Sequence, residues 1–380
     1  MSLEVVRARG RRPISRFVAL PWTLYDKGRH PQWIPPLRAM VRDSLDARRN
    51  PFYQTAEREL FLAFRDGRPV GRIAAIHNRR HNEFHDERVG FFGFFESTDD
   101  PEVARALVHA AGSWLAEKGL ERMRGPMSPS TNHECGLLVD GFDLPPTFMT
   151  PWNPPYYDAL LTGAGLERAK DLLAFHFNLE GGFALPERYA RVIARARGKA
   201  DFRFRLLDLS DFPAEAERAW EVYNSAWERN WGFVPMSRAE WDHMGEMLRH
   251  LLLEEFAYFA EVGGEPVAFV LGLPDYNVTL RRNPGGRLFP LGLLRLLRDR
   301  TKLRTGRLML LGIKERFRNR SIYFLMMDEL HRRAHAYGAT AAEASWILED
   351  NEPLLSFFRE AGMSPTKRWR IYEAALSPVA

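Results

Sequence analysis

Hydrophobic and polar residues follow two different periods along this chain. Two largely apolar stretches joined by a glycine turn predict a β-hairpin over 59–76, ELFLAF-RDG-RPVGRIAAI. Short apolar runs at 89–95 and 308–313 are typical of buried strands. Residues 101–119 and 322–338 have helical spacing and end in glycine, which commonly stops a helix. Strands and helices therefore alternate, and the pattern predicts an α/β fold.

The pattern occurs twice. FLAFRDGRPVGRI (61–73) matches YFAEVGGEPVAFV (258–270), and GAGLERAK (163–170) matches EAGMSPTK (360–367). Both matches have the same offset of 197 residues (258 − 61 and 360 − 163). Two segments about a hundred residues apart that share one offset indicate an internal duplication.

The middle of the repeat has another offset. Gly93 pairs with Gly312 and Gly119 with Gly338, both 219 residues apart (312 − 93 and 338 − 119). The second copy has therefore gained 22 residues (219 − 197) before its middle, and the first copy has gained as many after it. The extra pieces lie near 274–306 and 127–150.

The duplication predicts two tandem units, each with a mixed sheet flanked by helices. We expect a first domain over 1–180 and a second over 201–380. The segment 181–200 reads as a connector that carries a short basic helix.

The two copies differ where a strand leads into a helix. Such a turn leaves backbone N–H groups beside the positive end of the helix dipole, which attracts phosphate. The first copy reads FFESTDDPE (94–102) and the second IKERFRNRS (313–321), so the first turn is acidic and the second basic. The second copy is the one expected to bind a phosphorylated cofactor. The alternative is a helix start whose charges face water.

The order of elements resembles the GNAT acyltransferase fold, in tandem and over most of the chain. In that family an Arg/Gln-x-x-Gly-x-Gly/Ala turn holds the pyrophosphate of acyl-CoA. The segment from Arg318 to Tyr323 is in that register, although Ser321 and Tyr323 stand where glycines are usual. The turn could therefore bind CoA in a shifted pose, accept an acyl carrier protein, or bind neither, and a second register begins at Arg316.

The resemblance implies a set of residues around the donor. They are Ile313, Arg316, Arg318, Asn319, Arg320, Ser321 and Asn351. Family members often have a Tyr seven residues after the Asn, which protonates the leaving thiolate. Phe358 stands there in this chain and cannot do so.

Further segments resemble a bacterial ceramide synthase type of tandem GNAT protein, which N-acylates sphingoid bases. They are SWILEDN (345–351) with KRWRIYE (367–373), and NHECGLLVDGFDLPP (132–146) with PWNPPYY (151–157). The implied function is transfer of a long acyl chain from CoA, or from an acyl carrier protein, to a lipid-like amine. Two alternatives stay open: a Fem-type aminoacyl transferase, and a non-catalytic tandem GNAT-like binding protein.

The second insertion has the composition of a lipid-facing segment. Residues 288–304 combine the apolar run LFPLGLLRLL with interleaved and following basic residues. A basic amphipathic helix of this kind suits a membrane interface or the mouth of a lipid tunnel. The alternative is a helix packed on the neighbouring copy with its arginines in water.

Amine attack on a thioester needs a base or a desolvating pocket, because an amine with a pKa of about 10.4 is almost entirely protonated at pH 7. The candidates are His133 and Glu134 in the first insertion and Glu349 after a late strand of the second copy. In tandem GNAT proteins a cleft between the copies commonly forms the site. For His133 the favoured interpretation is a hydrogen-bonded structural residue.

No metal site is expected. His77, His81 and His85 are spaced by four, which would align them on a helix for a metal ion, but Arg and Asn fill the run and it follows a strand. A solvated hairpin loop is the interpretation favoured for this segment.

Composition and charge limit the partners and the cellular compartment that can be expected. The chain has 380 residues and a net charge of +5 from 54 basic and 49 acidic residues, so no nucleic-acid partner is expected. Cys135 is the single cysteine, which fits a reducing cytoplasm, and the basic N-terminus lacks a signal-peptide core. We expect a cytoplasmic protein, with possible peripheral contact at the inner face of the membrane.

Overall fold

The computed structural model describes residues 2–180, 187–197, 202–318 and 322–377. Contacts divide the chain into two compact units. The first unit comprises Met1–Leu172, Leu280–Gly292 and Lys367–Ala380, and the second comprises Leu173–Thr279 and Leu293–Thr366. These units differ from the contiguous domains expected from the repeat, because two later segments belong with the first copy.

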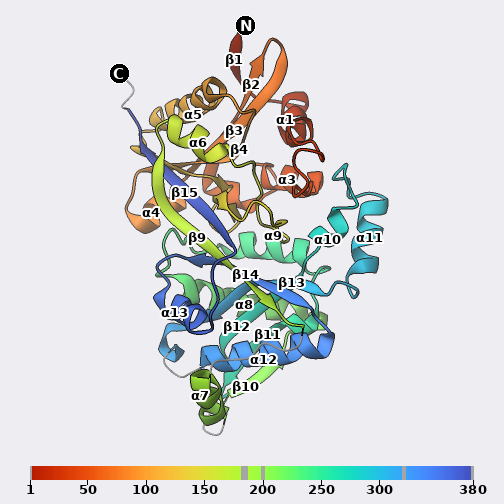
Figure 1. The fold of residues 1–380 in the computed structure, drawn as a ribbon. Coiled ribbons are helices and arrows are strands. Elements are labelled where there is room, and N and C mark those ends of the chain that lie inside the picture. The colour runs from red at the N-terminus through yellow and green to blue at the C-terminus, as the bar shows by residue number, and fades with distance from the viewer. Residues whose placement is uncertain (1, 181–186, 198–201, 319–321, 378–380) are drawn as a thin grey trace. The chain divides into compact units, whose positions relative to one another are not determined.

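The first unit contains a mixed sheet (Figure 1). Its order is β1-β2-β3-β4-β5-β15, and β8 also pairs with β15. The β4–β5 pair is parallel, whereas β1–β2, β2–β3, β3–β4, β5–β15 and β8–β15 are antiparallel. The strands are β1 (Leu3–Arg7), β2 (Ala56–Arg65), β3 (Arg68–Asn78), β4 (Val89–Ser97), β5 (Arg122–Gly125), β8 (Leu137–Asp140) and β15 (Lys367–Ala375).

Helices complete the first unit. They are α1 (Arg11–Ala19), α2 (Pro21–Leu24), α3 (Arg38–Ser44), α4 (Arg79–His85), α5 (Pro101–Ala116) and α6 (Tyr157–Gly163), together with the 3₁₀ helix η1 (Pro51–Gln54). Asp100 caps α5, since its carboxylate accepts from the backbone N–H groups of Glu102 and Val103, and Pro101 occupies the first turn. A short ribbon, β6 (Met127–Ser128) with β7 (Glu134–Cys135), forms within the first insertion.

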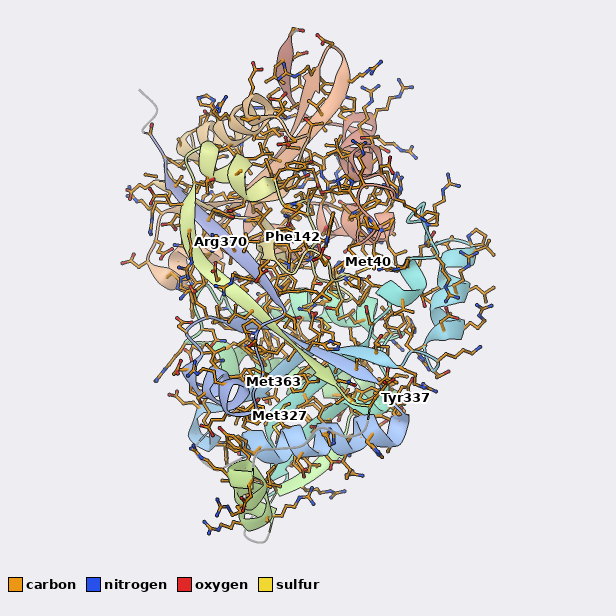
Figure 2. All side chains as sticks on the ribbon, in the orientation of Figure 1. Met40, Phe142, Met327, Tyr337, Met363 and Arg370 are labelled. Atoms are coloured by element: carbon orange, nitrogen blue, oxygen red, sulfur yellow. The ribbon has the colours of Figure 1, made fainter. Side chains whose placement is uncertain are left out.

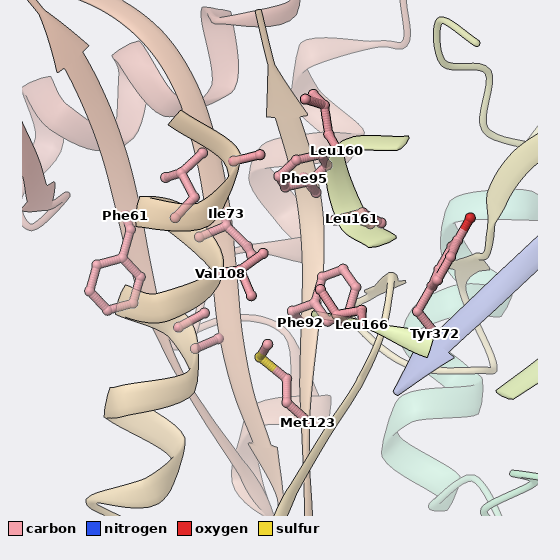
Figure 3. Close-up of a cluster of buried hydrophobic side chains, with 14 of the residues drawn as sticks. Phe61, Ile73, Phe92, Phe95, Val108, Met123, Leu160, Leu161, Leu166 and Tyr372 are labelled. Carbon is pink, nitrogen blue, oxygen red and sulfur yellow. The ribbon is translucent and has the colours of Figure 1, made fainter. Parts of the chain in front are cut away.

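The core of the first unit lies between α5 and the sheet. Figure 3 shows Val108 of α5 near Ile73 of β3, with Phe92 and Phe95 of β4 and Leu160 and Leu161 of α6. Tyr372 of β15 belongs to the same cluster. Each of these apolar side chains contributes about 1.5–3 kcal/mol by leaving water, so the last strand of the chain shares in the stability of the first unit.

The second unit repeats the plan. Its strand order is β10-β11-β12-β13-β14-β9; β13–β14 is parallel, and the other pairs from β10 to β13 are antiparallel. The elements are α7 (Glu187–Arg197), β10 (Phe202–Leu206), η2 (Leu209–Asp211), α8 (Phe212–Trp227), α9 (Arg238–Leu248), η3 (Glu254–Phe256), β11 (Ala257–Val262), β12 (Glu265–Pro274), α10 (Asn277–Leu280), α11 (Leu291–Asp299), β13 (Thr305–Ile313), η4 (Glu315–Phe317), α12 (Ile322–Tyr337), β14 (Ala341–Leu348) and α13 (Glu352–Glu360).

Glycines with positive φ mark equivalent turns in the two copies. The hairpin turns are Asp66-Gly67 and Gly263-Gly264, with φ of 50° and 77° and of 58° and 84°. Both residues of each pair are left-handed, as the type I′ turn between twisted strands requires. The duplication predicted from sequence is therefore visible in the backbone, and the predicted tandem α/β fold is confirmed.

The copies exchange their final strands. β9 (Glu167–Asn178) closes the first copy in sequence, yet its residues from Leu173 onward belong to the second unit. β15 closes the second copy in sequence, yet it pairs with β5 and β8 of the first unit. The first unit therefore includes a strand from the far end of the chain, and the second unit begins with the last part of the first copy's final strand.

The histidine segment is a helix, and the hairpin loop favoured from sequence is wrong. Residues Arg79–His85 form α4, and His81 is buried with its ring 4.5 Å from that of His85. His81 Nε2 lies 3.4 Å from Glu87 Oε2. Desolvation and the neighbouring His85 lower the pKa of His81 to about 4. A charged His81 is therefore unfavourable in the folded protein.

This burial predicts a loss of stability in mild acid. The unfolded chain binds a proton at His81 near pH 6.5 and the folded chain near pH 4, so stability falls as the pH drops through this window. Lowering the pH from 7.5 to 5 should cost about 2 kcal/mol through this group. Urea unfolding of the native protein and of His81→Gln at both values measures the difference. The exposed His109→Gln serves as control, and an equal pH response of the native protein and His81→Gln would contradict the assignment.

Candidate functional site

The basic turn of the second copy begins where β13 ends. Ile313 is buried as the last residue of β13, η4 follows, and α12 starts at Ile322. Asn319, Arg320 and Ser321, three of the residues expected around the donor, lie outside the described residues. Their predicted contacts with a phosphate therefore stay a prediction.

Lys314 and Arg316 lie around one carboxylate. Lys314 Nζ is 3.2 Å from Glu265 Oε1, and the Arg316 guanidinium donates to the same oxygen. The hydrogen bond from Lys314 lowers the pKa of Glu265. The Arg316 side chain is 63% exposed, so an incoming anion can reach it. Two cations are thus held close together at the surface of this turn.

Arg318 has a structural contact in addition to its predicted role. Its Nε donates to the carbonyl of Ile313 at 3.3 Å, and its Nη2 donates to the carbonyl of Ala226 in α8. These bonds connect the turn to α8. Contact of Arg318 with a donor phosphate stays a prediction. The guanidinium has five N–H groups, so it can donate to these two carbonyls and to a phosphate at the same time.

The equivalent acidic turn of the first copy is built around a buried carboxylate. Glu96 accepts from Tyr157 at 2.8 Å and from Arg72 at 3.3 Å, and also from Tyr25. Burial raises the pKa of Glu96, while Arg72 opposes the rise. With Asp100 capping α5, this turn carries negative groups where the second copy carries cations.

The parallel strands separate early in both units. The β4–β5 register runs from Val89 with Arg122 to Phe91 with Arg124, and the β13–β14 register from Thr305 with Ala341 to Leu308 with Ala344. Beyond these pairs, β13 continues to Ile313 and β14 to Leu348. The strands diverge toward the end that carries the turn and the start of α12.

In the first unit, its own insertion lies beside the diverging β4. A Cβ at Gly93 would be 1.8 Å from the carbonyl oxygen of Met127, and the Phe94 N–H donates to Ser128 Oγ at 3.0 Å. In the second unit the equivalent Gly312 lies against Trp227 of α8, where a Cβ would be 2.1 Å from the ring. The missing side chain at this position therefore lets the Met127 backbone approach Gly93 in the first copy and the Trp227 ring approach Gly312 in the second.

A buried polar network lies where β13 and β14 separate. Arg307 Nε donates to Ser345 Oγ at 3.0 Å, and Ser345 Oγ donates to Glu343 Oε1 at 2.8 Å. The Arg307 guanidinium also lies 4.7 Å from the centre of the Trp346 ring. Arg307, Glu343 and Ser345 are each at most 5% exposed. Sequence reasoning missed this network, although two polar residues spaced by two in an otherwise apolar strand were a signal for it.

Apolar pockets lie between α12 and the sheet of the second unit. Two adjoining pockets share Leu179, Leu308, Leu330, Ala334 and Ala342. Met327 and Tyr337 of α12, labelled in Figure 2, line one pocket each. Leu308 and Ala344, the last pair of the β13–β14 register, both line the pocket that contains Met327. The apolar space therefore reaches the point where the strands diverge.

The predicted catalytic residues of the first copy lie in its insertion. His133 precedes β7, its Nδ1 lies 2.9 Å from Ser130 Oγ, and its ring meets that of Phe52 edge-on with centroids 6.0 Å apart. Glu134 lies in β7 opposite Ser128. Both side chains are partly buried. The hydrogen bond to Ser130 gives His133 a structural contact, and a catalytic role for either residue stays a prediction.

The remaining predicted residues lie in the second unit. Glu349 follows β14 in a turn, and Asn351 precedes α13, where its carbonyl accepts from the Leu354 and Leu355 N–H groups. Phe358 is buried and stacks on Phe175 with ring centroids 3.9 Å apart. Phe358 is thus a core residue of this unit.

In the described part of the chain, no helix is long and apolar enough to span a bilayer. In the same residues, no three or more His, Cys, Asp or Glu side chains are grouped so that they could hold a metal ion.

The fold is that of a tandem GNAT protein. The acetyltransferase (GNAT) family matches residues 216–363. A solved structure of a tandem GNAT protein from the clavulanic acid biosynthesis pathway superposes with a TM-score of 0.55 over 100% of both chains, at 13% identity. At that identity the likeness shows the fold alone.

Two relatives match over nearly the whole length. Protein YghO of Escherichia coli is 34% identical over 367 residues, which is 95% of this chain and 92% of that protein. The bacterial ceramide synthase of Caulobacter vibrioides is 34% identical over 381 residues, 98% of each chain. The chain belongs to the tandem GNAT family of N-acyltransferases. It is an acyltransferase that uses an acyl-CoA thioester and an amine.

Proposed function

We propose that this enzyme transfers a long acyl chain to a sphingoid base and so forms a (dihydro)ceramide. The observation that carries the proposal is the 34% identity to the bacterial ceramide synthase of Caulobacter vibrioides over 98% of both chains. Neither a Fem-type aminoacyl transferase nor a non-catalytic binding protein is favoured by these matches.

We infer that the second copy binds the donor and that the first does not. Support comes from Lys314 and Arg316 at the basic turn, and from Glu96 and Asp100 at the equivalent acidic turn. Ile313, Arg318, Asn319, Arg320, Ser321 and Asn351 complete the proposed donor site. The donor at this site is acyl-CoA, and an acyl chain delivered by a carrier protein is the alternative that the donor panel below tests.

The apolar pockets under α12 favour a hydrocarbon acyl group. Each methylene that moves from water into an apolar pocket contributes about 0.8 kcal/mol. The lining residues shared by both pockets are hydrocarbon side chains, and the pocket reaches the last β13–β14 pair. We therefore expect the donor's chain to be selected by length.

The reaction joins the amine nitrogen to the thioester carbonyl carbon and breaks the C–S bond. The ammonium proton must leave before attack, and the thiolate must gain one when it departs. We propose Glu134, His133 and Glu349 as the candidates that accept the amine proton. The buried Arg307–Ser345–Glu343 network supports a fixed separation of the two strands beside the donor.

We infer that the enzyme works in the cytoplasm, at the inner face of the membrane. The single cysteine, Cys135, supports a reducing compartment, and a sphingoid base would be reached at a bilayer surface. Residues 288–304 are the proposed peripheral contact.

A donor panel tests the function. Purified protein is given acetyl-, octanoyl- and palmitoyl-CoA, and a palmitoyl-loaded carrier protein, each with sphinganine or with a short alkylamine. We expect palmitoyl transfer to sphinganine to exceed acetyl transfer by at least 100-fold in kcat/KM, because the pockets under α12 are apolar. Amide products are measured by mass spectrometry. Preference for acetyl-CoA, or equal use of the two amines, would overturn the proposal.

A further inference from the structure

Apolar side chains project into water from one short segment. Phe289, Leu291, Leu294 and Leu297 are 69%, 58%, 63% and 45% exposed. Among the described residues, the other large exposed hydrophobic side chains are scattered singly, at Phe84, Leu144, Leu206 and Val278. Scattered residues need no explanation, but a cluster on one helix indicates a surface that something covers.

The exposed leucines lie opposite the packed side of α11. At 100° per residue, the buried residues Gly292, Leu296 and Asp299 fall on one face. Leu294 is centred on the opposite face, with Leu291 and Leu297 beside it. An ordinary surface helix has polar residues there. In α11 three leucines lie there instead, with Arg298 between Leu294 and Leu291.

Residues from the N-terminal part of the same chain anchor the loop that precedes α11. The Trp22 indole N–H donates to the Pro284 carbonyl at 2.8 Å, and the Arg38 N–H donates to the Gly286 carbonyl at 2.9 Å. A Cβ at Gly286 would lie 2.5 Å from the Trp22 ring, so the loop fits closely there. The leucines are therefore presented outward by an anchored segment.

Charge identifies the partner. Between 281 and 304 the chain has eight basic residues and one acid, Asp299. Asp299 is buried, and one oxygen of its carboxylate accepts from Thr279 Oγ1 at 3.0 Å while the other accepts from Arg298 Nε at 3.3 Å, so the single acid already has partners. A second copy docked symmetrically would bring the eight cations of one segment against the eight of the other. An anionic lipid surface supplies both the apolar layer and the opposite charge.

We propose that Phe289, Leu291, Leu294 and Leu297 insert into the headgroup region of an anionic bilayer, with α11 in the plane of the membrane. The neighbouring arginines, including Arg287, Arg295 and Arg298, bind the lipid phosphates. This goes beyond the transfer reaction and does not depend on it, since vesicle binding is measured without donor or acceptor.

Vesicle flotation tests the proposal with the full-length protein. Vesicles of phosphatidylcholine alone are compared with vesicles that contain 30% phosphatidylglycerol, at low and high salt. We expect binding to the anionic vesicles that weakens with salt. The triple variant Leu291→Ser/Leu294→Ser/Leu297→Ser should bind at least tenfold more weakly. Arg295→Gln/Arg298→Gln should bind several-fold more weakly and depend less on salt.

Matched controls separate the proposal from general damage. Leu144→Ser and Leu206→Ser remove exposed leucines elsewhere and should bind as the native protein does. Thermal unfolding reports whether the triple variant is folded, and the arginine variant tests the same surface without removing apolar groups. Equal binding of the triple variant and native protein, or equal binding to neutral and anionic vesicles, would overturn the proposal. So would a concentration-dependent dimer that the triple variant loses, since the leucines would then contact a second copy.

Discussion

Asp171→Asn is expected to lower the free energy of unfolding by about 3 kcal/mol, because it removes the acid of a buried ion cluster and leaves the arginines without their carboxylate. The Asp171 side chain is fully buried and accepts from Arg370 Nε at 2.9 Å and Arg368 Nη1 at 3.1 Å, with Arg168 Nε at 3.3 Å. Burial opposes ionisation, but hydrogen bonds from Arg370 and Arg368 prevail and lower the pKa of Asp171. This carboxylate connects β9 to β15, the strand from the far end of the chain.

Urea unfolding at pH 7.5 measures the effect, and Glu167→Gln is the control. Glu167 lies on the same strand and is exposed, so its loss should change stability by less than about 0.5 kcal/mol. Because the folded pKa of Asp171 is lowered, its contribution is complete above the unfolded value near 3.9 and is lost as the pH falls through the folded pKa. If both variants unfolded at the same urea concentration, the cluster would not stabilise the strand exchange.

Local patterns predicted the elements of this fold well. The hairpin at 59–76 is β2–β3, the apolar runs at 89–95 and 308–313 lie in β4 and β13, and the helices at 101–119 and 322–338 are α5 and α12. These predictions succeed because periodicity and glycine turns are properties of neighbouring residues. The duplication could be predicted because two separate pairs of matching segments share one offset of 197 residues.

The strand exchange could not be predicted in this way. Nothing in the alternation of residues 367–375 says which sheet they join, since strand pairing is a long-range property. Polar residues of β9 and β15 indicate the pairing: Asp171 is charged in the interior of β9 and accepts from Arg368 and Arg370 of β15. A single buried acid opposite two arginines is too common in sequences to be recognised without the fold.

The sequence predicts the charge of the basic turn but not the contacts of its side chains. Lys314 and Arg316 both contact Glu265, an acid that lies 49 residues before Lys314 in the chain, and their role in donor binding stays a prediction. Arg318 looked equivalent to them in sequence, yet it contacts two carbonyls. A run of basic residues gives the charge of a turn, but the direction of each side chain depends on neighbours from other elements.

The copy that binds the donor can be tested by reversing charge on the two turns. Lys314→Glu/Arg316→Glu is expected to raise the KM for palmitoyl-CoA by about 10- to 1,000-fold, since each cation near the positive helix end contributes about 0.3–1 kcal/mol and charge reversal doubles the change at each of the two positions. The kcat should change little, because neither group touches the reacting carbonyl in the proposed site. Asp99→Lys, on the exposed surface of the first copy's turn, should alter KM less than twofold.

Folding of the reversed turn is controlled by adding Glu265→Lys to the double variant. The triple variant keeps opposite charges at the three positions and so restores the ion pairs with inverted sign, while the turn carries two acids in place of two cations. Its KM should exceed that of the native protein although the local pairs are intact. Raised salt should narrow the gap, because ions screen exposed charges. If Asp99→Lys and the double variant changed KM equally, the assignment of the donor to the second copy would be wrong.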